Sequence, residues 1–144
     1  MYTNLNELLK EFTPEELAIL TGDPSGSVID QARLDYAISN ASNLIDSFLR
    51  NRFDVPFNPV PILINFVARE LAVANLYEYY NHDGVVPPSI SRRKSYALYL
   101  LRQIQNGDIQ LDIADNSRRP VLMVNKDKDS RIFGNDILDT FVEM

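Results

Sequence analysis

The stretch from about residue 59 to residue 80 constrains the fold most, because its apolar residues cover nearly every face of a helix. A helix with that pattern needs protein on most of its sides. Polar and charged side chains interrupt it too often for about 20 lipid-facing residues: Asn65, Arg69, Glu70, Asn75 and Glu78. The sequence therefore predicts a central core helix, and it predicts no membrane partner.

A second long helix is predicted from about Asp30 to Asn51, where apolar residues at helical spacing trace one stripe. The stripe consists of Leu34, Ala37, Ile38, Ala41, Ile45, Phe48 and Leu49. A third helix is predicted to begin with Ser89 or Ser91 as its cap and to end at Gly107. The inner face of this third helix is predicted to carry Ile90, Ala97, Leu100, Leu101 and Ile104.

The N-terminal residues carry two shorter helical signals. Thr3 is predicted to cap a first turn with apolar residues at helical spacing. The segment Thr13-Pro14-Glu15-Glu16 combines a capping threonine, a proline at the first helical position and a glutamate three residues after the cap. That combination is a capping box and predicts a second helix.

After Gly107 the helical period disappears. Ile109, Leu111 and Ile113 alternate with other residues, and Val121-Leu122-Met123-Val124 is a short β-prone run. The sequence therefore predicts a mainly α fold, a compact bundle of about four to five helices with an extended, partly β C-terminal segment. Residues 1–107 are expected to form the helical core domain. Residues 108–144 are expected to pack on that core or on a neighbouring subunit.

No combination of residues predicts catalysis. The chain has no cysteine and one histidine, His82, which leaves no thiolate chemistry and little basis for a metal cluster. Ser91-Arg92-Arg93-Lys94 matches the S-x-x-K motif without its companion motifs. The loop from Asn125 to Asp136 resembles a calcium-binding loop but has Ser130 where the sharp turn needs glycine. We therefore expect no enzyme activity, no cofactor and no bound metal.

The net charge of −6 is uneven, since residues 1–60 hold 4 basic and 9 acidic side chains. A surface of that sign repels phosphate backbones, so we expect no sequence-specific nucleic-acid partner. Two basic clusters are the local exceptions, Arg92-Arg93-Lys94 and Arg118-Arg119. The first cluster has two interpretations: a solvated turn, or a contact with an acidic surface such as the N-terminal half of another copy.

The order of these segments resembles the Mu-like prophage family known as gp36-type proteins. The long helix resembles the family pattern through Ala41-Ser42 and Ile45-Asp46-Ser47-Phe48-Leu49, and the following connection does so through Arg52-Phe53-Asp54-Val55-Pro56. Ile104-Gln105-Asn106-Gly107 closes the last helix as in the family. Further along the chain, Ser130-Arg131-Ile132-Phe133 with Leu138 and Phe141 is similar to the family's C-terminal end.

The resemblance implies a structural role as a head–tail connector or head-completion protein, with an α-helical core in a ring beneath the portal. It implies contacts with other copies of the chain, with the portal and with tail-completion proteins. An extended segment would contact the neighbours, which makes Arg131, Phe133, Leu138 and Phe141 candidate contact residues. The chain is then expected in the virion or in the host cytoplasm, since residues 1–10 lack the apolar region of a signal peptide. The alternative is an adaptor or regulatory domain that binds a bacterial protein through its acidic face.

Overall fold

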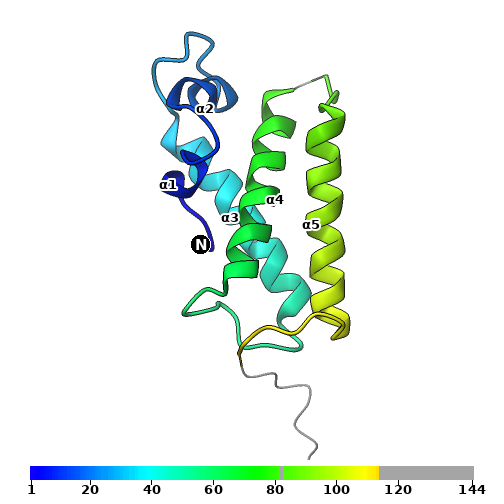
Figure 1. The fold of residues 1–144 in the computed structure, drawn as a ribbon. Helices are drawn as coiled ribbons and strands as arrows, with labels where there is room; N and C mark the ends of the chain where they lie inside the picture. Colours follow the sequence, from blue (N-terminus) through cyan, green and yellow to red (C-terminus); the bar gives the residue numbers. More distant parts are fainter. Residues whose placement is uncertain (82, 114–144) are drawn as a thin grey trace, which may run out of the picture.

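The computed structural model describes residues 1–81 and 83–113. Five α-helices and no strand are found in this part of the chain (Figure 1). They are α1 (Leu5–Leu8), α2 (Pro14–Leu20), α3 (Gln31–Leu49), α4 (Ile62–Tyr80) and α5 (Pro88–Asn106). The prediction of a mainly α bundle of four to five helices is confirmed. His82 and residues 114–144 lie outside the described residues, and so does most of the segment predicted to be partly β.

Helix α4 is the central element that its sequence predicts. It packs against α3, against α5 and against α2, and Figure 1 shows α3 crossing behind it while α5 runs alongside. Its buried side chains occupy most of its circumference: Ile64, Val67, Ala68, Glu70, Leu71, Ala72, Val73, Ala74 and Leu76. Among the described helices, none is long and apolar enough to cross a membrane.

The starts of the helices agree with the sequence only in part. The capping box of α2 is confirmed, because Thr13 Oγ1 accepts from the Glu16 amide and Glu16 accepts from the Thr13 amide. The predicted turn of α1 is present but its predicted cap, Thr3, is wrong: the side chain of Asn4 caps the helix, accepting from the Glu7 amide at 3.0 Å. Thr3 is buried instead, and its hydroxyl has no hydrogen-bond partner among the described residues.

The predicted cap of α5 is also wrong. Neither Ser89 nor Ser91 caps the helix, because α5 begins at Pro88 with Pro87 in the cap position and without a side-chain cap. A proline at the first helical position fits there because that position needs no backbone donor. The two prolines therefore set the start of α5 where the serines were expected to do so.

The C-terminal end of α5 is fixed by two residues far apart in the sequence. Gly107 adopts a left-handed conformation with φ of 90°, as a C-terminal cap requires. The buried guanidinium of Arg52 donates to the carbonyl of Ile104 at 2.8 Å, where a cation also offsets the negative end of the helix dipole. Arg52 belongs to the connection between α3 and α4, so this contact ties that connection to the end of α5.

Residues 108–113 turn back toward the core instead of leaving it. The amides of Asp108 and Ile109 donate to the carbonyl of Gln103. Three apolar side chains then pack partly buried against the core cluster: Ile109, Leu111 and Ile113. These residues form no strand, and their path ends beside the N-terminus of α4.

Candidate interaction surfaces

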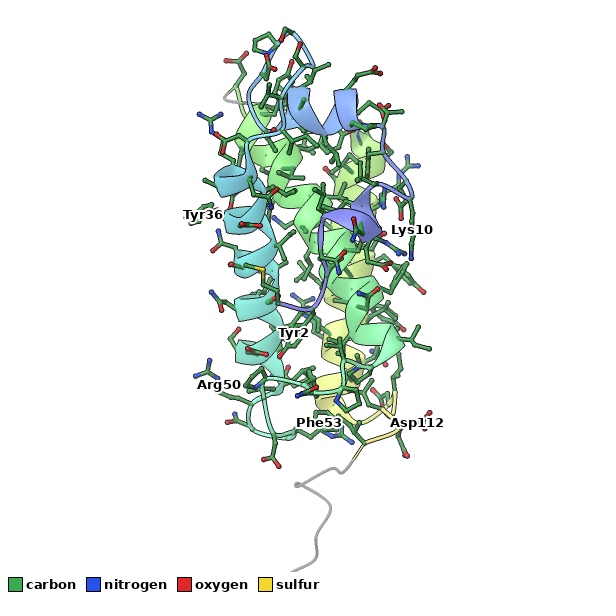
Figure 2. All side chains as sticks on the ribbon, turned by 90° about the vertical axis from the view of Figure 1, so that its left-hand side faces the viewer. Tyr2, Lys10, Tyr36, Arg50, Phe53 and Asp112 are labelled. Carbon is green, nitrogen blue, oxygen red and sulfur yellow. The ribbon has the colours of Figure 1, made fainter. Side chains whose placement is uncertain are left out.

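Tyr2 anchors the N-terminal segment to three parts of the fold. Its amide donates to Ser42 Oγ at 3.1 Å, and its carbonyl accepts from Asn65 Nδ2 at 2.7 Å. Its phenol donates to Asp46 and accepts from the Phe57 amide at 3.1 Å. Burial, and next the hydrogen bond to Asp46, raise the pKa of Tyr2 to about 12. Figure 2 shows Tyr2 between α3 and α4.

A cluster of ion pairs holds α5 and the turn after α1 to α4. Arg93 Nε lies 2.6 Å from Glu70 Oε2, and Arg93 Nη2 lies 2.7 Å from Glu11 Oε2. Glu70 is buried. Arg69 Nε lies 3.0 Å from Glu11 Oε1, close enough for an ion pair although not aligned as a hydrogen bond. The hydrogen bond to Glu70 is the main cause that raises the pKa of Arg93, so the cluster favours a permanently charged guanidinium.

The predicted basic contact residues have different environments in the structure. Arg93 and Lys94 form ion pairs inside the chain, Lys94 with Glu78. Arg92 is exposed. The acidic surface that the first basic cluster meets thus includes carboxylates of its own chain. The other candidate contact residues lie outside the described residues: Arg118, Arg119, Arg131, Phe133, Leu138 and Phe141.

An exposed apolar face runs along α4 and α5, and we call its four side chains, Ile62, Phe66, Tyr96 and Tyr99, the α4–α5 face. Ile62 is 91% exposed, and Tyr96 and Tyr99 are 53% and 54% exposed. The Phe66 and Tyr96 rings meet edge to face with centroids 6.5 Å apart, and Tyr96 stacks on Tyr99 at 6.5 Å. Aromatic side chains of this kind are enriched where proteins contact other proteins.

A groove of about 690 Å³ continues the α4–α5 face toward the N-terminus of α4. Ile62 and Phe66 belong to both the face and the lining of the groove. The opposite wall of the groove is formed by the last described residues, from Gln110 to Ile113. The surface is therefore one continuous feature built from α4, α5 and the segment that follows α5.

A second hollow, of about 1020 Å³, lies at the other end of α4. Tyr36 and Tyr79 line it with their ring centroids 5.6 Å apart, and Asn40 donates to the Tyr79 hydroxyl at 2.7 Å. Arg33 stands at its edge beside Gly22. Figure 2 shows Tyr36 on the upper part of α3 and Asp112 at the lower end of the bundle. The described residues thus present two different surfaces, one near each end of α4: an apolar face, and a hollow lined by tyrosines together with Arg33, Glu78 and Asn81.

The remaining polar features of the described residues have structural roles. The carboxylate of Asp23 accepts hydrogen bonds from Ser25, from the Ser27 amide and from the Val28 amide, with Ser25 the largest cause that lowers the pKa of Asp23 to about 2. The loop from Gly22 to Val28 is therefore closed by hydrogen bonds to the Asp23 side chain. No group of three or more histidine or acidic residues suited to a metal ion occurs within the ranges the structure describes.

Within residues 1–81 and 83–113 the fold is a small all-α domain that exposes an apolar face on α4 and α5 and a hollow at the other end of α4. The chain belongs to the family described as "Bacteriophage Mu, Gp36", whose model matches residues 2–122. It is also similar to the "Mu-like prophage FluMu protein gp36" of Haemophilus influenzae, with 23% identity over 116 residues, covering 81% of this chain and 79% of that relative. The resemblance to the Mu-like gp36-type family is confirmed, and the protein is phage-related.

Proposed function

We propose that the protein is a structural component of a phage or prophage particle, a head–tail connector or head-completion protein at the portal–tail junction. Membership in the bacteriophage Mu Gp36 family is the observation that carries this proposal. In this role the protein has no enzyme activity and acts through contacts with other proteins. Its place is the assembling particle, in the host cytoplasm and then in the virion.

The hollow near the C-terminal end of α4 and the C-terminal residues support an arrangement in a ring. A ring is built from heterologous contacts, in which one surface of a copy meets a different surface of the next copy. One copy offers two such different parts, the hollow around Tyr36 and the apolar steps at Phe133, Leu138 and Phe141. The partners in this arrangement are further copies of the chain together with the portal and tail-completion proteins.

The C-terminal residues supply the second part of the proposal. The apolar steps of this segment are Phe133, Leu138 and Phe141, which lie with Ile132, Ile137 and Val142 among polar and charged residues and follow Arg131. We assign these four residues to contacts with a neighbouring copy or with the portal. An apolar side chain that inserts into a partner's pocket contributes more to binding than the charged residues at a rim.

The decisive test is electron microscopy of the full-length protein mixed with its cognate portal. The proposal expects a ring of copies on the portal, and it expects the variants Phe133→Asp and Leu138→Asp to lose that ring while keeping the helical content of the natural chain. An Asn116→Asp variant, also beyond α5 but outside the apolar steps, serves as the control. A natural chain that stays off the portal would overturn the proposal.

An adaptor domain that binds a bacterial protein through its acidic face is the alternative. The excess of acidic side chains in residues 1–60 favours it. The connector and the adaptor can be distinguished by the particle size of the protein, measured over a range of concentrations, alone and with the portal. A chain that stays monomeric in both conditions favours the adaptor.

A further inference from the structure

Three of the ten exposed large apolar side chains of the described residues lie on the α4–α5 face: Ile62, Tyr96 and Tyr99. Ile62 stands 91% exposed at the first position of α4, and two tyrosines stack beside it more than half exposed. A contiguous patch of this kind marks a surface that another segment covers. The question is which segment has the chemistry and the reach to do so.

The path of the chain identifies a segment within reach. The last described residue, Ile113, lines the same groove as Ile62 and Phe66, so the chain continues from the edge of the face. The Tyr96 ring centroid lies 6.5 Å from that of Phe66, which places the face close to that point. The next seven residues, 114–120, span up to about 25 Å when extended. The apolar run Val121-Leu122-Met123-Val124 therefore begins within reach of the whole face.

The chemistry of that run suits the surface. It is the longest uninterrupted apolar run after α5, and alternate side chains of an extended segment point to one side. Residues 116–128 carry four basic and one acidic side chain, whereas the whole chain has a net charge of −6. Asp112 lies exposed in the wall of the groove, and Asp108 is exposed nearby in sequence. The basic side chains that flank the run are therefore complementary to Asp112 at the groove, while the apolar run itself carries no charge to meet Arg69, whose guanidinium lies over the Phe66 ring.

We propose that Val121–Val124 packs on the α4–α5 face of its own chain, with the groove guiding its approach. A short connection gives an attached segment an effective concentration in the millimolar range, which favours the same chain over a neighbour. This packing does not depend on the role in the virion. It leaves residues 130–144 beyond the packed run, where the apolar steps of the proposed neighbour contact lie.

The test uses the absence of cysteine in the natural chain. An Asn125→Cys variant of the full chain takes one nitroxide spin label just beyond the run, which itself stays intact. We expect the label to broaden the amide signals of Ile62, Phe66, Tyr96 and Tyr99, and to leave those around Tyr36 sharp. Leu122→Asp in the labelled chain should abolish the broadening, whereas the matched Leu138→Asp should keep it.

A mixed sample tests whether the run packs on its own chain or on a neighbouring copy. In this sample one protein carries the spin label but no ¹⁵N, and the other carries ¹⁵N but no spin label. The proposal expects no broadening in this mixture. A second pair of variants tests the surface: Tyr96→Ser with Tyr99→Ser should weaken the broadening, and Tyr36→Ser should not. Broadening that is absent from the face, that survives Leu122→Asp, or that appears in the mixture overturns the proposal.

Discussion

At the scale of single residues, Tyr2 shows how one side chain near the chain's start takes part in the core. Its phenol serves both as a donor to Asp46 and as an acceptor from the Phe57 amide. Its ring also packs against that of Phe57, with centroids 5.6 Å apart. Because the phenol must keep its proton to donate, the folded state favours the neutral form of Tyr2.

This preference predicts a loss of stability in alkaline solution. The pKa of Tyr2 is about 12 in the folded protein against 10.0 for an ordinary tyrosine, so its contribution is complete below pH 10 and is lost as pH rises toward 12. We expect the free energy of unfolding to fall by on the order of 2 kcal/mol across that interval. Urea unfolding between pH 9 and 12 measures it. The Tyr2→Phe variant should show a smaller decline, and an equal decline would contradict the assignment.

Gly107 is a second residue with a testable conformational role. Its φ is positive, and an added Cβ would lie 2.6 Å from Arg52 Nη1, which holds the end of α5. We expect Gly107→Ala to cost more than about 1 kcal/mol, or roughly 4 °C or more in Tm by calorimetry. Gly84→Ala is a matched control, since Gly84 also has positive φ but no atom near its added Cβ. Equal losses in the two variants would show that the Arg52 contact does not matter.

At the scale of helices, the pair of Arg93 and Glu70 joins α5 to α4, and Glu11 extends the contact to the turn after α1. Glu70 is 5% exposed, so it depends on Arg93 for compensation of its charge. The basic cluster at the start of α5 is therefore partly a structural feature. Its position opposes the helix dipole, and the carboxylates of other elements offset that cost.

The pair predicts a contrast between adjacent arginines. Arg93→Met leaves the Glu70 carboxylate buried and unpaired, and we expect it to cost about 3 kcal/mol in chemical denaturation. Arg92→Met removes an exposed side chain and should change stability by less than about 0.5 kcal/mol. If both variants lose the same amount, the buried pair is not the reason. The double variant Arg93→Met with Glu70→Leu should recover part of the loss.

The sequence predicts these helices well where the signals are local. The stripe in α3, the capping box of α2 and the Gly107 cap each depend on residues within a few positions of one another. The sequence does not predict the roles of Tyr2, Arg52 and Arg93, because their partners lie 44, 52 and 82 residues away. It misplaces the caps of α1 and α5 because several adjacent residues are suitable caps, and the packing selects among them.

The candidate contact surfaces are also predicted only in part by the sequence. The sequence marks the apolar steps after Gly107, but it does not show that Ile62 projects from the buried helix or that Tyr96 and Tyr99 stack beside it. Helical spacing alone assigns Ile62 to a helix that is apolar all round. Only the three-dimensional arrangement separates its exposed end from its enclosed middle.

At the scale of the whole molecule, the surfaces allow stability and assembly to be separated. Tyr36 is 60% exposed at the hollow near the C-terminal end of α4. We expect Tyr36→Ala to change the free energy of unfolding by less than about 0.5 kcal/mol but to weaken binding to the portal about tenfold or more, as for a contact residue at an interface. Calorimetry and co-sedimentation give the two quantities. Asn43→Ala, an exposed residue elsewhere on α3, is the control, and equal binding by both variants would exclude the hollow as a contact.

The anchoring of Tyr2 has a consequence for the order of folding events. Its hydrogen bonds reach residues 40, 44, 55 and 63 positions away, so they form only after α3, α4 and their connection have come together. Contacts that form after the transition state slow unfolding without speeding folding. We therefore expect Tyr2→Phe to raise the unfolding rate in stopped-flow experiments and to leave the refolding rate nearly unchanged. A segment that comes early in the sequence would then be among the last to reach its native position.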